Sequence, residues 1–285
     1  VLPARLRARK PTGGKVEILL IRRVGNGSSW WCMTSPGRGL VPGTRLAIGD
    51  ELEAEMVERD GNGRFLLTLH ARSGSVDEAI HRHGVPPVPP YIRREPGDDL
   101  ERMDRERYQT VYAREEGAIA APTAGLHFTE EALGRLQGMG IGLARVTLHV
   151  GPGTFQPVRT ASIEDHRVEA EWGRLPEVTA AAITDCRRKG GRVAAVGTTT
   201  TRLLESRAEE DGRVRPGEGW CELTIGPEYR FRAVDALVTN FHLPRSSLLV
   251  LVAAFAGRRR ILEAYTHAVE QRFRFYSYGD AMLIL

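Results

Sequence analysis

The stretch RVAAVGTTTTRLLES, residues 192–206, runs from a short apolar strand pattern through a glycine and four threonines into a helical pattern. The stretch AVDALVTNFHLPRSSLLVLVAAFAG, residues 233–257, likewise runs from an apolar strand pattern through a polar junction into a helical pattern. From residue 99 onward, strand patterns alternate with helical ones, which predicts an α/β domain with a largely parallel sheet. We expect helices over 100–114, 129–140, 177–191 and 258–275 and a strand over 141–151.

The N-terminal part has a different pattern. Residues 1–82 read as short strands with a hairpin turn at 60–63, followed by a short helix capped by Ser75. Residues 83–98 are rich in proline and predict a linker. We therefore expect a small β-rich domain over 1–82, a linker over 83–98 and a large α/β domain over 99–285.

Composition excludes several classes of protein. Of the 285 residues, 41% are hydrophobic and 27% charged, as in folded globular chains, and no apolar run is long enough to span a membrane. The three cysteines form no CxxC pair, which argues against a disulfide scaffold and predicts the reducing cytoplasm. The chain begins VLPARL without methionine and no secretory signal is visible, so we expect an N-terminal part to be missing.

Arginines dominate the basic residues. The formal net charge is +4 and the sequence pI is near 9.1, and arginines cluster at 22–23, 93–94, 187–188 and 258–260. The planar guanidinium suits phosphate, so these clusters are candidates for nucleic-acid contact. Solvated surface arginines are the alternative interpretation.

Three histidines mark junctions next to glycine or proline. His127 lies in AAPTAGLHFT, His149 precedes a Gly-Pro-Gly turn over 151–153, and His242 follows Asn240 at a strand end. Because ligands of α/β sheets bind beyond the carboxyl ends of strands, we expect these histidines to share one active site. Asn240 and His242 are costly to bury unless they are satisfied by a network or a ligand.

Other polar segments allow two interpretations each. Thr198, Thr199 and Thr200 open a helix whose free amides could hold a carboxylate or phosphate; alternatively, Thr198 or Thr199 simply caps the helix. Glu169 and Glu171 in IEDHRVEAEW, 163–172, could supply a general base or a solvated strand. The tail RFRFYSYGDAMLIL, 272–285, could stack bases or form a packed C-terminal strand, with Asp280 as a further acid.

The sequence lacks the motifs of a metal site, of a serine hydrolase and of a P-loop. There is no HExxH or tight His/Cys cluster for a metal, no GxSxG elbow for a hydrolase and no GK[ST] of a P-loop.

Long motifs resemble those of one family, the S-adenosylmethionine:tRNA ribosyltransferase-isomerases of queuosine synthesis. They are RYQTVYAREEGAIAAPTAGLHFTEEAL, VTLHVGPGTFQPV, GTTTTRLLES, VDALVTNFHLPRSSLLVLVAAFAG and FRFYSYGDAMLIL. The resemblance implies transfer of the ribosyl part of S-adenosylmethionine onto 7-aminomethyl-7-deazaguanine at the wobble position of tRNA, giving epoxyqueuosine, adenine and methionine. It implies no metal or other cofactor. It also implies a large α/β domain with an incomplete barrel-like mixed sheet, into which a small antiparallel β-barrel domain is inserted.

The sulfonium acidifies the neighbouring C5′ hydrogens, so such a reaction needs a base, an acid for the leaving adenine, and polar anchors. We expect His127 and His242 at the reacting centre, with Glu171 as a further catalytic candidate. Substrate contacts are expected from a second set of residues: His149, His166, Asn240, Asp280, Thr198, Thr199 and Thr200. Arg258, Arg259 and Arg260 are expected to bind the tRNA anticodon loop.

Two departures from the family pattern stand out. The family normally carries about sixty residues before VLPARL, including an NDTR element. It also often reads HxMHxE where this chain has HRVEAE, so His166 and Glu171 match but Glu169 replaces a histidine. Two other functions remain open: an S-adenosylmethionine-dependent RNA methyltransferase, whose glycine-rich loop is missing here, and a non-catalytic RNA-binding protein.

Overall fold

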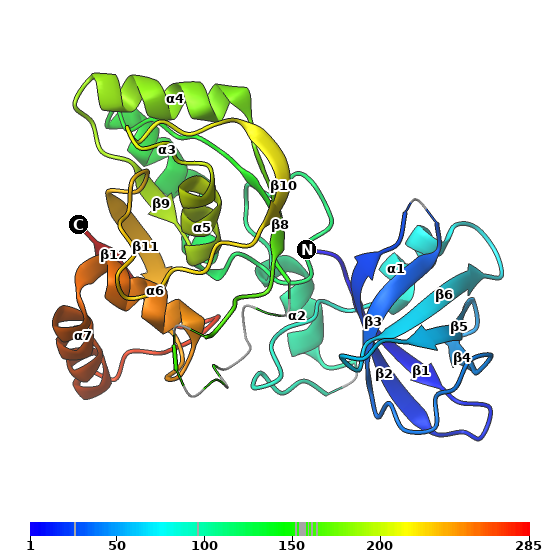
Figure 1. Cartoon of the computed structure of the whole chain (residues 1–285). Coiled ribbons are helices and arrows are strands. Elements are labelled where there is room, and N and C mark those ends of the chain that lie inside the picture. Colours follow the sequence, from blue (N-terminus) through cyan, green and yellow to red (C-terminus); the bar gives the residue numbers. More distant parts are fainter. Residues whose placement is uncertain are drawn as a thin grey trace. The chain divides into compact units, whose positions relative to one another are not determined.

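The computed structural model describes residues 1–25, 27–95, 97–151, 153, 158, 160, 162–163 and 165–285. The chain divides into two compact units, Val1–Gln109 and Thr110–Leu285, and each is described by itself (Figure 1). The domain boundaries expected from the sequence, at 82 and 99, stay a prediction.

The first unit contains a closed six-stranded antiparallel barrel in the order β1-β2-β3-β6-β5-β4. Along each strand, apolar side chains that point into the barrel alternate with more exposed ones, as the period of two requires. At the predicted hairpin turn, Oδ1 of Asp60 accepts hydrogen bonds from the amides of Asn62 and Arg64. The strands are β1 Arg5–Arg9, β2 Lys15–Arg23, β3 Ser29–Ser35, β4 Arg45–Ile48, β5 Leu52–Arg59 and β6 Phe65–Ala71.

Two helices follow the barrel strands. α1, Val76–His83, begins with the predicted cap at Ser75, which forms a capping box with Glu78. The predicted helix over 100–114 is shorter than expected: α2 covers Asp99–Arg107, because Tyr108 leaves the helical conformation and buries its ring.

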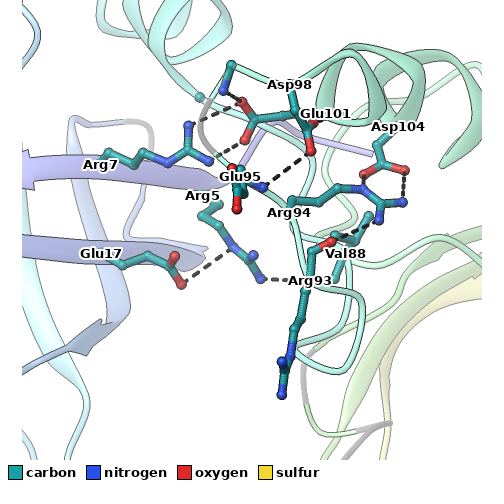
Figure 2. A network of polar contacts seen from close by, with 12 residues as sticks. Arg5, Arg7, Glu17, Val88, Arg93, Arg94, Glu95, Asp98, Glu101 and Asp104 are labelled. Atoms are coloured by element: carbon teal, nitrogen blue, oxygen red, sulfur yellow. Dashed lines mark hydrogen bonds and ion pairs between the residues drawn. The ribbon is translucent and has the colours of Figure 1, made fainter.

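Polar contacts fasten the proline-rich segment and α2 to the barrel (Figure 2). Nε of Arg94 donates to Oδ2 of Asp104 at 2.6 Å, and this carboxylate is 3% exposed. Nη2 of Arg5, on β1, donates to the carbonyl of Val88 at 2.8 Å, and Arg7 pairs with Glu101. The segment around residue 88 is therefore held in place as part of the first compact unit.

The second unit combines helices with two three-stranded sheets, in the orders β10-β8-β7 and β12-β11-β9 (Figure 1). Helix α5 contacts strands of both sheets, and apolar residues from β9, β11, α4, α5 and α6 form one core cluster. The elements are η1 Thr123–His127, α3 Glu130–Gly138, β7 Thr147–His149, β8 Glu171–Leu175, α4 Glu177–Arg188, β9 Ala194–Val196, α5 Thr198–Ser206, β10 Gly217–Cys221, β11 Ala236–Asn240, α6 Ser247–Ala256, α7 Arg258–Glu270 and β12 Ala281–Ile284.

The predicted small β-barrel is confirmed and the second unit combines helices with sheets, but the prediction of a largely parallel sheet is wrong. Among the strands described in the second unit, only β9 and β11 pair in parallel. A parallel pair needs a crossover such as α5, whereas β12 returns to β11 as an antiparallel strand. The strand expected over 141–151 is also shorter, because only Thr147–His149 finds a partner, on β8.

No helix among the residues placed by the structure is long and apolar enough to cross a membrane.

Candidate functional site

Three of the polar motifs meet at one end of the mixed sheet. The amide of Gly197, just after β9, donates to the carbonyl of Val238 on β11 at 2.8 Å. The 3₁₀ helix η1 packs against β11, and a Cβ on Gly197 would lie 3.8 Å from the Cβ of Ala124. The structure thus brings the segments of His127, the threonine run and Asn240 together at the carboxyl ends of two parallel strands.

The threonine run begins α5 without a side-chain cap. Gly197 is the N-cap, with φ +93°, a conformation that glycine adopts far more readily than other residues. Thr200 and Thr201 donate their hydroxyls back to the carbonyls of Val196 and Gly197. Capping by Thr198 or Thr199, one of the two interpretations above, is therefore wrong, and the amides of the first turn remain available to an anion.

Asn240, the last residue of β11, is 2% exposed. Its Nδ2 donates to the carbonyl of Tyr276 at 2.9 Å, but no described group donates to its Oδ1. Tyr276 itself has φ +75°, a strained conformation for an aromatic residue. An unpartnered buried acceptor is costly, which makes Oδ1 of Asn240 a candidate to accept a hydrogen bond from a bound ligand.

His242 is almost completely buried. Its Nε2 lies 2.7 Å from Oγ1 of Thr239, and its backbone amide donates to the hydroxyl of Tyr265. Burial lowers the pKa of His242 to about 4, and burial also raises the pKa of Tyr265 to about 12. The imidazole is therefore neutral at pH 7 and is a weaker base than an ordinary histidine.

His127, by contrast, is exposed at the end of η1. The helix packs closely behind it, because a Cβ on Gly125 would lie 2.2 Å from the hydroxyl of Tyr112. Thr129 then caps α3, because its side chain accepts a hydrogen bond from the amide of Ala132. This support fixes the backbone while the imidazole faces solvent.

Glu171 is buried against α5. Its Oε2 accepts from Nη1 of Arg202 at 2.6 Å, and both side chains are 4% exposed. The same guanidinium donates to the carbonyls of Glu169, Cys221 and Leu223. The catalytic role expected for Glu171 stays a prediction, but this geometry favours a positioning role.

His149 lies against Trp172, with ring centroids 4.7 Å apart. Gly117 backs the imidazole so closely that a Cβ there would lie 2.6 Å from Cε1. Burial lowers the pKa of His149, while the nearby carboxylate of Glu115 opposes that shift. Of the Gly-Pro-Gly turn predicted after His149, Pro152 lies outside the described residues.

The other expected site residues lie apart from this cluster or serve the backbone. His166 borders a small hollow with Thr224 and Ser247. Oδ2 of Asp280 accepts from the amide of Arg274 at 2.7 Å and so fixes the tail turn that carries Tyr276. In the described part of the chain, no hydrogen bond or ring contact joins His127, His149 and His242, so their shared site stays a prediction.

The arginine run 258–260 begins α7 and is exposed. Gly257 is its N-cap, with no side-chain cap and no acidic residue in the first turn. Only Arg259 has an ion-pair partner among the placed residues, Glu263 at 3.8 Å. Three arginines at the positive end of a helix dipole are mutually unfavourable unless an anion binds there.

Sequence reasoning missed Arg202, Thr239, Tyr265 and Trp172. Arg202 could have been suspected, because it stands between Thr201 and Leu203 on the buried face of α5. Among the placed residues, no group of three or more His, Cys, Asp or Glu could hold a metal ion.

Comparison with known proteins agrees with these motifs. A family model described as Queuosine biosynthesis protein matches residues 1–284. The chain is 51% identical to the S-adenosylmethionine:tRNA ribosyltransferase-isomerase of Trichlorobacter lovleyi and 50% identical to that of Geobacter sulfurreducens, over 100% of this chain and 82% of each relative.

A crystal structure of an S-adenosylmethionine tRNA ribosyltransferase from Thermotoga maritima is 36% identical, with a TM-score of 0.47, over 100% of this chain and 79% of that one. The match of the family model to nearly every residue, together with relatives that are half identical over the full chain, shows that this chain belongs to the queuosine biosynthesis protein family.

Proposed function

We propose that the chain is an S-adenosylmethionine:tRNA ribosyltransferase-isomerase. It would transfer and isomerise the ribosyl part of S-adenosylmethionine onto 7-aminomethyl-7-deazaguanine at the tRNA wobble position, releasing adenine and methionine. Family membership supports the proposal, since the relatives carry this enzyme name. The observation that carries it in the structure is the meeting of η1, the start of α5 and the end of β11 around the unpartnered Oδ1 of Asn240.

The two ends of S-adenosylmethionine suit this cluster. The uncapped amides of α5, with the hydroxyls of Thr198 and Thr199, would hold an anionic or hydroxyl-bearing part of the co-substrate, its carboxylate or its ribose. Oδ1 of Asn240 accepts only, so it would receive a donor such as the amino group of a base edge.

The chemistry needs a proton acceptor at C5′ of the ribose, which the adjacent sulfonium acidifies. His127 is our candidate, because its exposed imidazole can meet a substrate and histidine is the side chain that most often serves as a general base. Loss of the C5′ proton would break the C4′–O4′ bond and give a vinyl sulfonium, and the released O4′ would form an aldehyde at C1′ and expel adenine, which takes up a proton. The aminomethyl nitrogen of the tRNA base would then add to C4′ and lose a proton, and the resulting C5′ ylide would close on the C1′ aldehyde. The alkoxide formed there would displace methionine from C5′ and so close the epoxide.

His242 is better suited to keep the neighbouring elements in position than to accept the C5′ proton. Its neutral imidazole contacts Thr239 at the end of β11, and its backbone amide donates to the hydroxyl of Tyr265 on α7, so His242 ties these two elements together next to Asn240. We assign no cofactor to the reaction, as the family resemblance implies, with S-adenosylmethionine as co-substrate.

The target base lies in the anticodon loop, whose bases are already unpaired. Moving one into a pocket costs on the order of a few kcal/mol at most. The phosphates of the loop would bind the arginine run at the start of α7. The cytoplasm, where tRNA is modified, stays our predicted location.

We also infer the finer architecture from the family. The barrel unit would be an insertion in the large domain, whose sheets would belong to one incomplete barrel.

The test is an incubation of the protein with S-adenosylmethionine and tRNA carrying 7-aminomethyl-7-deazaguanine. Mass spectrometry of the nucleosides should find epoxyqueuosine and free adenine. A methylated nucleoside with S-adenosylhomocysteine would favour a methyltransferase instead. RNA binding without any turnover would favour a non-catalytic RNA-binding protein.

A further inference from the structure

The sheet β10-β8-β7 has one buried face and one open face. On β8, Glu171, Gly173 and Leu175 are buried, and a Cβ on Gly173 would lie 3.0 Å from atoms of Leu203 on α5. Side chains alternate along a strand, so Trp172 and Arg174 point to the opposite face. Both are only partly buried there.

A row of aromatic rings crosses this open face. His149 on β7, Trp172 on β8 and Trp220 on β10 are direct register partners, so their side chains leave the sheet on the same side. His149 and Trp172 are in ring contact, and Trp220 is 55% exposed. An exposed tryptophan beside two further rings is not explained by the packing of a core.

The chain holds this row in place. At one end Gly117 has no side chain, and the imidazole of His149 occupies the space that a Cβ would fill. Arg174, two residues after Trp172 on the same face, has a side chain that is 38% exposed and pairs with Glu115. Burial lowers the pKa of His149, so its ring is neutral near pH 7 and can stack like the indoles beside it.

We propose that this open face is a stacking platform for unpaired bases of RNA. Sheet surfaces that bind single-stranded RNA carry aromatic rings in neighbouring strands, with arginine beside them, and each ring stacks on one base. Direct register partners on neighbouring strands lie about 4.5–5.5 Å apart, close enough to serve successive bases. The occupant would be the unpaired anticodon loop, so the proposal rests on the proposed function. The rings carry the proposal rather than the charge of the face, because Arg174 is accompanied there by Glu115 and Glu218.

The test measures binding of a fluorescently labelled anticodon stem-loop RNA by anisotropy. Trp220→Ala should weaken binding roughly tenfold, the loss of one base–aromatic stack, and Trp220→Phe should restore most of the affinity. Met139→Ala is the matched control, because Met139 is a large side chain that is 74% exposed outside this sheet. The ratio of the wild-type affinity to the Trp220→Ala affinity should be the same at two salt concentrations, since stacking releases no counterions.

Three results would overturn the platform. The first is unchanged affinity for Trp220→Ala, the second is a Phe variant as weak as the Ala variant, and the third is an equal loss of affinity for a fully paired RNA hairpin stem. A change of sedimentation coefficient in Trp220→Ala with unchanged RNA affinity would assign the face to self-association instead. Failure of the proposed function is separate: wild-type protein would then form no epoxyqueuosine, while Trp220→Ala would still weaken loop binding.

Discussion

Nη1 of Arg202 donates to Oε2 of Glu171 at 2.6 Å, and each of the two side chains is 4% exposed. This buried pair joins α5, which carries the threonine run at its start, to β8. Because the carboxylate of Glu171 is bound to this guanidinium, the pair fixes the position of α5.

Arg202→Leu should destabilise the protein by about 3–5 kcal/mol, because Glu171 then remains as a buried charge without its partner. Glu171→Gln keeps the shape and an acceptor for Arg202, so we expect a smaller loss of about 1–3 kcal/mol. Urea unfolding followed by circular dichroism measures both. If Glu171 were the catalytic base, Glu171→Gln would instead lower kcat by about 10²-fold or more in folded enzyme.

The stability of the protein should depend on pH through His242. Its pKa is about 4 in the folded protein, whereas an unfolded histidine titrates near about 6.5. Between these pH values the unfolded chain binds a proton that the folded chain does not, so the free energy of unfolding falls as pH falls from about 6.5 to 4, by on the order of 3 kcal/mol. His242→Gln should lose this component in urea titrations at several pH values, whereas the exposed His70→Gln should keep it.

His127→Ala should abolish turnover without unfolding the protein. The side chain is exposed, so the free energy of unfolding should change by no more than about 0.5 kcal/mol. If the imidazole takes the C5′ proton, kcat should fall by about 10²–10⁴-fold. Rapid-quench measurement of adenine release checks this, and wild-type kcat in the variant would remove His127 from the reaction.

Asn240→Ala should weaken binding of S-adenosylmethionine. The variant removes the unpartnered Oδ1 and the bond to the carbonyl of Tyr276, so we expect KM for S-adenosylmethionine to rise about tenfold, the effect of about 1.4 kcal/mol. Steady-state kinetics at saturating tRNA gives the value. An unchanged KM with a lower melting temperature would mean that Asn240 only supports the tail turn.

Replacing Arg258, Arg259 and Arg260 by glutamine should weaken tRNA binding and reduce its dependence on salt. If each arginine neutralises one phosphate, the slope of log K against log salt should decrease by about three. Filter binding at several salt concentrations measures this slope. Arg188→Gln is the control, because Arg188 is exposed but pairs with Asp185, and an equal effect there would mean that only net charge matters.

Local signals in the sequence were sufficient for most elements. Ser75, Thr129 and Ser246 cap helices as their residue types indicate, and the turn at Asp60 joins two barrel strands. The strand directions in the second unit were beyond local signals, because β8, β10 and β12 pair antiparallel with strands that are distant in sequence.

In the candidate site, too, positions set by local sequence were predictable, whereas contacts between distant elements were not. The sequence pattern placed His127, Thr198 and Asn240 at junctions, and the fold brings their segments together. It did not reveal that Glu171 is paired with Arg202, that His242 is buried on Thr239, or that Trp172 and Trp220 stand side by side. Each of these depends on contacts between residues of different elements, which no local pattern encodes.

Ribosyl transfer can be followed by the fate of the ribose carbons of S-adenosylmethionine. S-adenosylmethionine labelled with ¹³C in the ribose is incubated with tRNA carrying 7-aminomethyl-7-deazaguanine, and the digested nucleosides are analysed by mass spectrometry. We expect all ribose label in epoxyqueuosine, with unlabelled adenine and methionine released in equal amounts. Label that remains in S-adenosylhomocysteine, beside a methylated nucleoside, would show methyl transfer and rule out ribosyl transfer.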